Sequence, residues 1–219
     1  LHVSSLAAVL NSAAVSFFSQ LGVRRIVFPR YVPLETMRAI INHSPNGLEY
    51  EAFILNDGCV FEEGYCFVSH GFGGAFCHNP LWRYRVIVTG DDDPKTAGAE
   101  GKTLEIENES FERHIDEYKR WLWVGIKNFF GMPGSKGYPL GMCGLCALPR
   151  LKEMGVMSLK IVGREAPLKK KVESVKLVKK VLDYLEDGHS EEEVVGLAKS
   201  IRGTKGLCES GYMCYYRQI

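Results

Sequence analysis

The sequence has no long apolar run and no marked excess of either charge. Its hydrophobic segments are shorter than the ~20 residues that a helix needs to cross a bilayer, so we expect no membrane span. The 27 Lys and Arg residues nearly balance the 26 Asp and Glu residues, for a net charge of +1. This balance leaves RNA binding possible but gives it no electrostatic support. Repeats are also lacking, and 219 residues suit a single domain with a proper core.

The seven cysteines are an odd number, so they cannot all pair in disulfides within one chain. Three of them lie in a polar, glycine-rich stretch, residues 57–80: Cys59, Cys66 and Cys77. Glycine lets this backbone fold tightly back on itself. A polar loop of this kind is poorly suited to the core and well suited to surround a metal. The segment from Met142 to Cys146 is the expected source of a fourth ligand. Clustered thiols of this kind are typical of metal or redox sites in a cytoplasmic protein.

Thiolates bind iron–sulfur clusters and zinc alike, and four are needed in either case. The wide spacing of the first three cysteines favours a 4Fe-4S cluster, because its irons lie several ångströms apart. The short Cys143-Gly-Leu-Cys146 segment is similar to half of a zinc knuckle, so zinc is the alternative. His70 and His78 could replace a thiol, although we expect both to be hydrogen-bonded loop residues.

The first quarter of the chain predicts alternating strands and helices. Apolar residues at the spacing of one buried face predict a helix from about Leu6 to Leu21, capped by Ser4 or Ser5. Strands are expected at 25–29 and 48–55, with a helix from Pro33 to about Asn42 between them. This order is typical of parallel βαβ units, in which ligands gather at the carboxyl ends of the strands. The cysteine loop begins at such an end.

The rest of the chain continues the α/β pattern around an insertion at about residues 90–140. We expect a strand at 82–89 and a helix rich in aromatic residues at 108–130. Further on, we expect helices at 146–154 and 167–186, a strand at 157–162, and a final helix capped by Ser190. The lysines of the 167–186 helix are expected to form a solvated face, with RNA contact as the less favoured alternative.

Three cations follow or flank predicted strands. Arg30 comes after the second strand, and Lys160 and Arg164 flank the end of the strand at 157–162. A guanidinium at the carboxyl end of a strand can clamp a carboxylate through two hydrogen bonds. We therefore expect an anionic small molecule there, and ordinary surface ion pairs are the alternative.

Several of these segments together resemble the collagenase-like peptidase family U-32. They are residues 3–11 (Val-Ser-Ser-Leu-Ala-Ala-Val-Leu-Asn), residues 21–30 (Leu-Gly-Val-Arg-Arg-Ile-Val-Phe-Pro-Arg), the cysteine loop, and residues 155–164 (Gly-Val-Met-Ser-Leu-Lys-Ile-Val-Gly-Arg). The resemblance implies a TIM-like α/β barrel, of which this chain would hold the later half as one domain that lacks an earlier portion. It departs from many relatives in having Asn56-Asp57-Gly58 where they have a His-Gly pair before the first cysteine.

The resemblance also implies a chemistry. Relatives include oxygen-independent hydroxylation proteins that act on ubiquinone precursors, transfer RNA or ribosomal RNA, and that are thought to use prephenate as oxygen source. Carried over to this chain, the 4Fe-4S ligands would be Cys59, Cys66, Cys77 and Cys146. Other relatives are named peptidases, so proteolysis is the second hypothesis. A third is a non-catalytic, metal-bearing protein that pairs with a second U-32-like subunit.

Overall fold

A computed structural model describes residues 1–56, 136–139, 141–163, 166–203, 208 and 214–216. The chain divides into two compact units, one made of Leu1–Phe67 with Lys127–Ile219 and the other of Val68–Ile126. Every described residue belongs to the first unit. The strand expected at 82–89 and the helix expected at 108–130 therefore lie outside the described residues.

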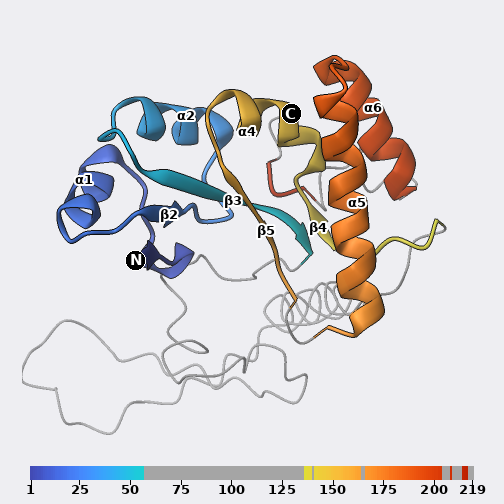
Figure 1. The fold of residues 1–219 in the computed structure, drawn as a ribbon, viewed down its shortest axis with the longest axis horizontal. Helices are drawn as coiled ribbons and strands as arrows, with labels where there is room; N and C mark the ends of the chain where they lie inside the picture. Colours follow the sequence, from blue (N-terminus) through green and yellow to red (C-terminus); the bar gives the residue numbers. More distant parts are fainter. Residues whose placement is uncertain (57–135, 140, 164–165, 204–207, 209–213, 217–219) are drawn as a thin grey trace, which may run out of the picture. The chain divides into compact units, whose positions relative to one another are not determined.

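The described part contains a five-stranded sheet with β3 at its centre (Figure 1). Its strands are β1 (His2–Val3), β2 (Arg25–Val27), β3 (Glu49–Asn56), β4 (Met142–Cys143) and β5 (Ser158–Ile161). Strand β3 runs parallel to β2 and β5, and β1 runs parallel to β2, whereas β4 pairs with β3 in the antiparallel direction. The expected parallel sheet is confirmed.

The pairing register places β4 at the carboxyl end of β3. Glu51 pairs with Val27 of β2 and with Ser158 of β5. Each edge of a strand pairs with one neighbour at a given residue, so β2 and β5 lie on opposite edges of β3. Leu55 likewise pairs with Cys143 of β4 and with Ile161 of β5. Strands β2 and β4 therefore follow one another along the same edge of β3. The segment from Cys143 to Cys146, called the cysteine knuckle below, therefore begins beside the carboxyl end of β3.

The helices that accompany the sheet make the described unit a mixed α/β structure. They are α1 (Ser12–Gln20), α2 (Leu34–Asn42), α4 (Leu148–Glu153), α5 (Leu168–Glu186) and α6 (Glu191–Arg202), with short 3-10 turns η1 (Ser5–Ala7) and η4 (Leu145–Ala147). Helix α5 packs against β3 and α4, and α6 packs against α5 and η4. Among the described helices, none is both long enough and apolar enough to span a membrane.

The helix expected over Leu6–Leu21 begins later than predicted. Ala8 adopts a left-handed conformation with φ of 48°, which ends the η1 turn. Asn11 then caps α1 by accepting a 2.8 Å hydrogen bond from the backbone N–H of Ala14. The apolar spacing runs through both segments, so it does not reveal the break between them. The capping box predicted at Ser190 is confirmed, with Glu193 as its partner.

The two faces of β3 differ in chemistry. Tyr50 and Ala52 are buried on one face. Side chains alternate along a strand, so Glu49, Glu51 and Phe53 lie on the opposite face. The register with β5 shifts between Phe53 and Leu55, and beyond this irregularity Asn56 donates a hydrogen bond to Ser174 of α5. The face with Glu49, Glu51 and Phe53 carries the polar groups described next.

Candidate functional site

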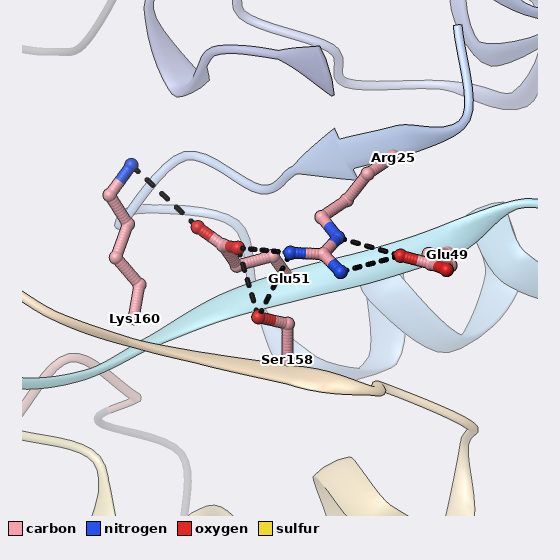
Figure 2. Close-up of polar contacts among 5 residues, drawn as sticks. All are labelled: Arg25, Glu49, Glu51, Ser158 and Lys160. Carbon is pink, nitrogen blue, oxygen red and sulfur yellow. Dashed lines mark hydrogen bonds and ion pairs between the residues drawn. The ribbon is translucent and has the colours of Figure 1, made fainter. Parts of the chain in front are cut away.

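The face of β3 that carries Glu49 and Glu51 bears a cluster of charged side chains around Arg25 (Figure 2). Its guanidinium contacts the carboxylate of Glu49 through Nε at 2.8 Å and Nη2 at 2.6 Å. Its Nη1 lies 3.3 Å from Glu51 Oε2. The hydrogen bond that Arg25 donates to Glu49, followed by the charges of both carboxylates, raises the pKa of Arg25. Three strands contribute to this cluster, since the hydroxyl of Ser158 on β5 donates a 2.9 Å hydrogen bond to Glu51.

Lys160 extends the cluster toward the carboxyl end of the sheet. Its Nζ lies 3.8 Å from Glu51 Oε1 and 5.1 Å from the centre of the Phe53 ring. The guanidinium carbon of Arg30 lies 3.9 Å from the centre of the same ring. The structure thus brings two of the three predicted cations together on one aromatic side chain. A ring face attracts cations through its quadrupole, so Phe53 holds both in place.

The positions of these cations relative to the strand ends differ slightly from the prediction. Lys160 lies within β5, between Ser158 and Ile161, and Arg30 lies three residues after the end of β2. Arg164, the third predicted cation, lies outside the described residues. Two positive groups that share one platform can bind both oxygens of a carboxylate or several oxygens of a phosphate. Glu51 is the carboxylate beside Lys160, at 3.8 Å.

Phe53 also links this cation pair to the cysteine knuckle. Its backbone oxygen accepts a 2.8 Å hydrogen bond from the buried hydroxyl of Tyr216. A Cβ on Gly144 would lie 2.8 Å from the Tyr216 ring and 3.2 Å from the Phe53 oxygen, so the knuckle needs glycine at this position. The cation platform and the turn between Cys143 and Cys146 are therefore parts of one packed arrangement.

The described part of the chain contains four cysteines, none of which forms a disulfide there: Cys143, Cys146, Cys208 and Cys214. Cys143 forms an isolated parallel bridge with Cys214, and its backbone oxygen accepts a 2.9 Å hydrogen bond from Tyr215. Within the described residues, no group of three or more His, Cys, Asp or Glu side chains is close enough to hold a metal ion.

Burial controls the titration of both knuckle thiols. It raises the pKa of Cys146 to about 12, and the neighbouring sulfur of Cys143 adds to the shift. Burial likewise raises the pKa of Cys143, while the charge of Arg202 and the backbone N–H of Leu145 act in the opposite direction. The Sγ of Cys143 accepts that hydrogen bond at 3.5 Å. As free groups these thiols keep their protons at neutral pH.

The predicted metal ligands fall mostly outside the described residues. Cys59, Cys66 and Cys77 lie there, together with His70 and His78. Cys146, the described one, is partly buried in the η4 turn beside a second thiol. Thiolate is the ligand that both iron–sulfur clusters and zinc take, so the donor chemistry at this position fits either group.

The sequence analysis did not identify two buried polar residues at the site, Asn56 and Arg202. Asn56, the last residue of β3, is buried with φ of 84°, a conformation that asparagine tolerates better than most residues. Its Nδ2 donates to Val162 O and to Ser174 Oγ, both at 3.0 Å, and its Oδ1 is buried without a partner in the described part. Arg202 is buried at the end of α6. Asparagine before Asp-Gly suggests a turn, whereas nothing in the local sequence indicates the burial of Arg202.

Comparison with known proteins identifies the family to which the chain belongs. The family model of Peptidase family U32 matches residues 1–219. The chain belongs to this family. It is also 31% identical over 100 residues to "tRNA hydroxylation protein P" of Escherichia coli (strain K12), a match over 42% of this chain and 22% of that protein. The match spans about a fifth of the relative's length, and no solved structure matches the chain.

Proposed function

We propose that this U32 protein carries a 4Fe-4S cluster and takes part in an oxygen-independent hydroxylation-type reaction in the cytoplasm. Cys59, Cys66, Cys77 and Cys146 would hold the cluster, with zinc as the alternative group. When bound, the cluster would supply electron transfer or Lewis-acid chemistry. The substrate would be a transfer RNA, by likeness to the hydroxylation protein, or a quinone precursor. The parallel sheet would form part of a TIM-like barrel.

The observation that carries the proposal is the link through Phe53. Its ring lies beside Arg30 and Lys160, and its backbone oxygen holds Tyr216 against the knuckle that contains Cys146. A small anion on the two cations would therefore lie near the expected cluster ligand. Arg30 and Lys160 would bind the anion, and prephenate is the expected one. Before the anion binds, Glu51 would orient Lys160. Arg164 would complete the set.

The thiols favour hydroxylation over proteolysis. A cysteine protease needs a thiolate of lowered pKa, whereas burial raises the pKa of both Cys143 and Cys146. Metal binding does not have this difficulty, because the metal displaces the proton. The family's name keeps peptidase activity as a second candidate. Cleavage of gelatin that survives Cys59→Ser and Cys146→Ser would favour it.

The first experiment tests the cluster. We expect protein purified anaerobically to contain iron and acid-labile sulfide in about equal amounts and to absorb broadly near 400 nm. Cys146→Ser should lower both contents strongly. A colourless wild-type protein that contains zinc and no iron would overturn the cluster and leave the zinc alternative.

The second experiment tests the anion site with prephenate as the probe. Lys160→Met and Arg30→Met should each weaken binding by about tenfold, the loss expected for one charge-assisted hydrogen bond. Lys180→Met is the matched control, since it removes the same charge from an exposed position on α5. Equal binding by wild type and Lys160→Met would contradict the assignment.

A further inference from the structure

The two carboxylate oxygens of Glu51 have different partners (Figure 2). Its Oε2 accepts a 2.9 Å hydrogen bond from the hydroxyl of Ser158 and lies 3.3 Å from Nη1 of Arg25. Its Oε1 lies 3.8 Å from Nζ of Lys160, which is within ion-pair distance but too long for a hydrogen bond. Arg25 and Ser158 therefore hold Glu51 more closely than Lys160 does.

Arg25 is itself fixed on its other side by Glu49. Its Nε and Nη2 contact Oε2 of that carboxylate at 2.8 and 2.6 Å. The guanidinium is planar and rigid, so this contact sets the direction of Nη1, the atom that reaches Glu51 and, at 3.5 Å, Ser158. The strands keep these side chains together, because Arg25 pairs in register with Glu49 and Glu51 pairs with Ser158.

A carboxylate beside Lys160 competes with any anion that needs the same ammonium group. The side chain of Glu51 is only 14% exposed, and charges interact more strongly there than in bulk water. If Glu51 moved onto Lys160, it would neutralise the ammonium group and repel an incoming anion. The contacts with Arg25 and Ser158 oppose this movement, because Glu51 would have to give up both of them.

We propose that Arg25 is a positioning residue of the anion site and acts through Glu51. Together with Ser158 it holds this carboxylate by Oε2, so that Lys160 can leave Oε1 and turn to the anion. Arg25 touches neither the anion nor the cluster in this scheme. The inference rests on the proposed function, since it takes Lys160 as a group that binds the anion.

The first test measures prephenate binding by wild type, Arg25→Met, Glu51→Gln and the double variant. Arg25→Met should weaken binding by about three- to tenfold, because Glu51 then turns its charge to Lys160. Glu51→Gln should bind at least as tightly as wild type, since a neutral amide does not repel the anion. Adding Arg25→Met to Glu51→Gln should cause no further loss. A direct attraction between Arg25 and the anion predicts equal losses in both backgrounds, and that result, or no loss in either, would overturn the proposal.

Arg38→Met is the matched control, because Arg38 also contacts a carboxylate through two nitrogens but does so between α2 and α4. It should leave prephenate binding unchanged. Ser158→Ala is the second variant, in case Arg25→Met does not fold. It removes the 2.9 Å hydrogen bond to Glu51 and leaves the contact between Arg25 and Glu49 in place. It should weaken binding in the wild-type background and not in Glu51→Gln, and equal effects in the two backgrounds would again count against the proposal.

A second measurement needs no ligand and separates this inference from the proposed function. Urea denaturation of Glu51→Gln, Lys160→Met and their combination gives the coupling between Glu51 and Lys160. This coupling should be larger in the Arg25→Met background, or in Ser158→Ala where that variant does not fold, because Lys160 then no longer shares the carboxylate. A wild-type protein that does not bind prephenate would overturn that ligand, and the coupling would still decide on Arg25. An equal or smaller coupling in the variant background would overturn the inference.

Discussion

The hydroxyl of Tyr216 donates a 2.8 Å hydrogen bond to the backbone oxygen of Phe53. Both residues are buried, and they lie 163 positions apart in the chain. This contact fastens the carboxyl-terminal segment to the central strand at the residue whose ring lies beside Arg30 and Lys160. Tyr216, which follows α6 in the chain, is therefore part of the candidate site.

Removing that hydroxyl should destabilise the fold. Tyr216→Phe leaves the buried oxygen of Phe53 without this donor, which costs about 1–3 kcal/mol. Urea denaturation followed by circular dichroism measures the loss. Tyr184→Phe is the control, because Tyr184 is only partly buried on α5, where it stacks on His189. Equal losses in the two variants would argue against a specific role for the Tyr216 contact.

Gly144 should tolerate no side chain. The Cβ of Gly144→Ala would lie 2.8 Å from the Tyr216 ring, so the ring or the knuckle must shift. We expect a loss of about 1–3 kcal/mol, as for other overpacked sites, and less bound iron in anaerobic preparations. Gly196→Ala is the matched control within α6, where a Cβ meets nothing within 4 Å. It should gain about 0.5–1 kcal/mol from the higher helix propensity of alanine.

The sequence predicts the fold well where local patterns are strong. The strand at 48–55, the helix beginning after Pro33 and the long helix at 167–186 all match observed elements within about a residue. The break at Ala8 was missed because apolar spacing continues through it, and only its left-handed backbone separates η1 from α1. The parallel pairing of β2 with β3 followed from the βαβ order, whereas the sequence did not predict that β5 pairs with β3.

The candidate site was predictable only in part, because its geometry depends on contacts distant in sequence. The sequence predicts Arg30 and Lys160 as cations near strand ends, and the structure adds that Phe53 brings them together. The assignment of Cys146 as a ligand is implied by the family resemblance and stays a prediction. The burial of Arg202 depends on how α6 packs beside residues 139–141. A basic residue in the last turn of a helix is ordinarily an exposed partner of the helix dipole, so its sequence context suggests the wrong environment.

The stability of variants at Asn56 should depend on the left-handed backbone conformation at this position. Asn56→Ala and Asn56→Gly both lose the hydrogen bonds to Val162 and Ser174. Alanine must in addition hold a φ of 84°, which costs an L-residue about 1–2 kcal/mol. We therefore expect the alanine variant to be the less stable of the two in urea denaturation. At an ordinary strand position the order is reversed, so a more stable alanine variant would contradict the left-handed conformation.

The ion pair between Arg38 and Glu153 should make part of the stability depend on pH. Their side chains connect α2 to α4 through contacts of 2.9 and 3.2 Å. The hydrogen bond from Arg38, followed by its charge, lowers the pKa of Glu153 below its ordinary value. A carboxyl group of lowered pKa stabilises the folded state above its unfolded pKa, and this contribution is lost as the pH falls through the folded pKa.

The free energy of unfolding of wild type should accordingly exceed that of Glu153→Gln at pH 7, and this difference should vanish at strongly acidic pH. Urea denaturation across this range measures it. Other carboxyl groups also titrate there, so the comparison is repeated in the Arg38→Met background, which removes the partner. The pH-dependent difference between Glu153 and Gln should become much smaller in that background, because Arg38 is the main cause of the lowered pKa and the charge of Arg150 is a lesser one. A difference of undiminished size without Arg38 would contradict the assignment of the lowered pKa of Glu153 to the Arg38 contact.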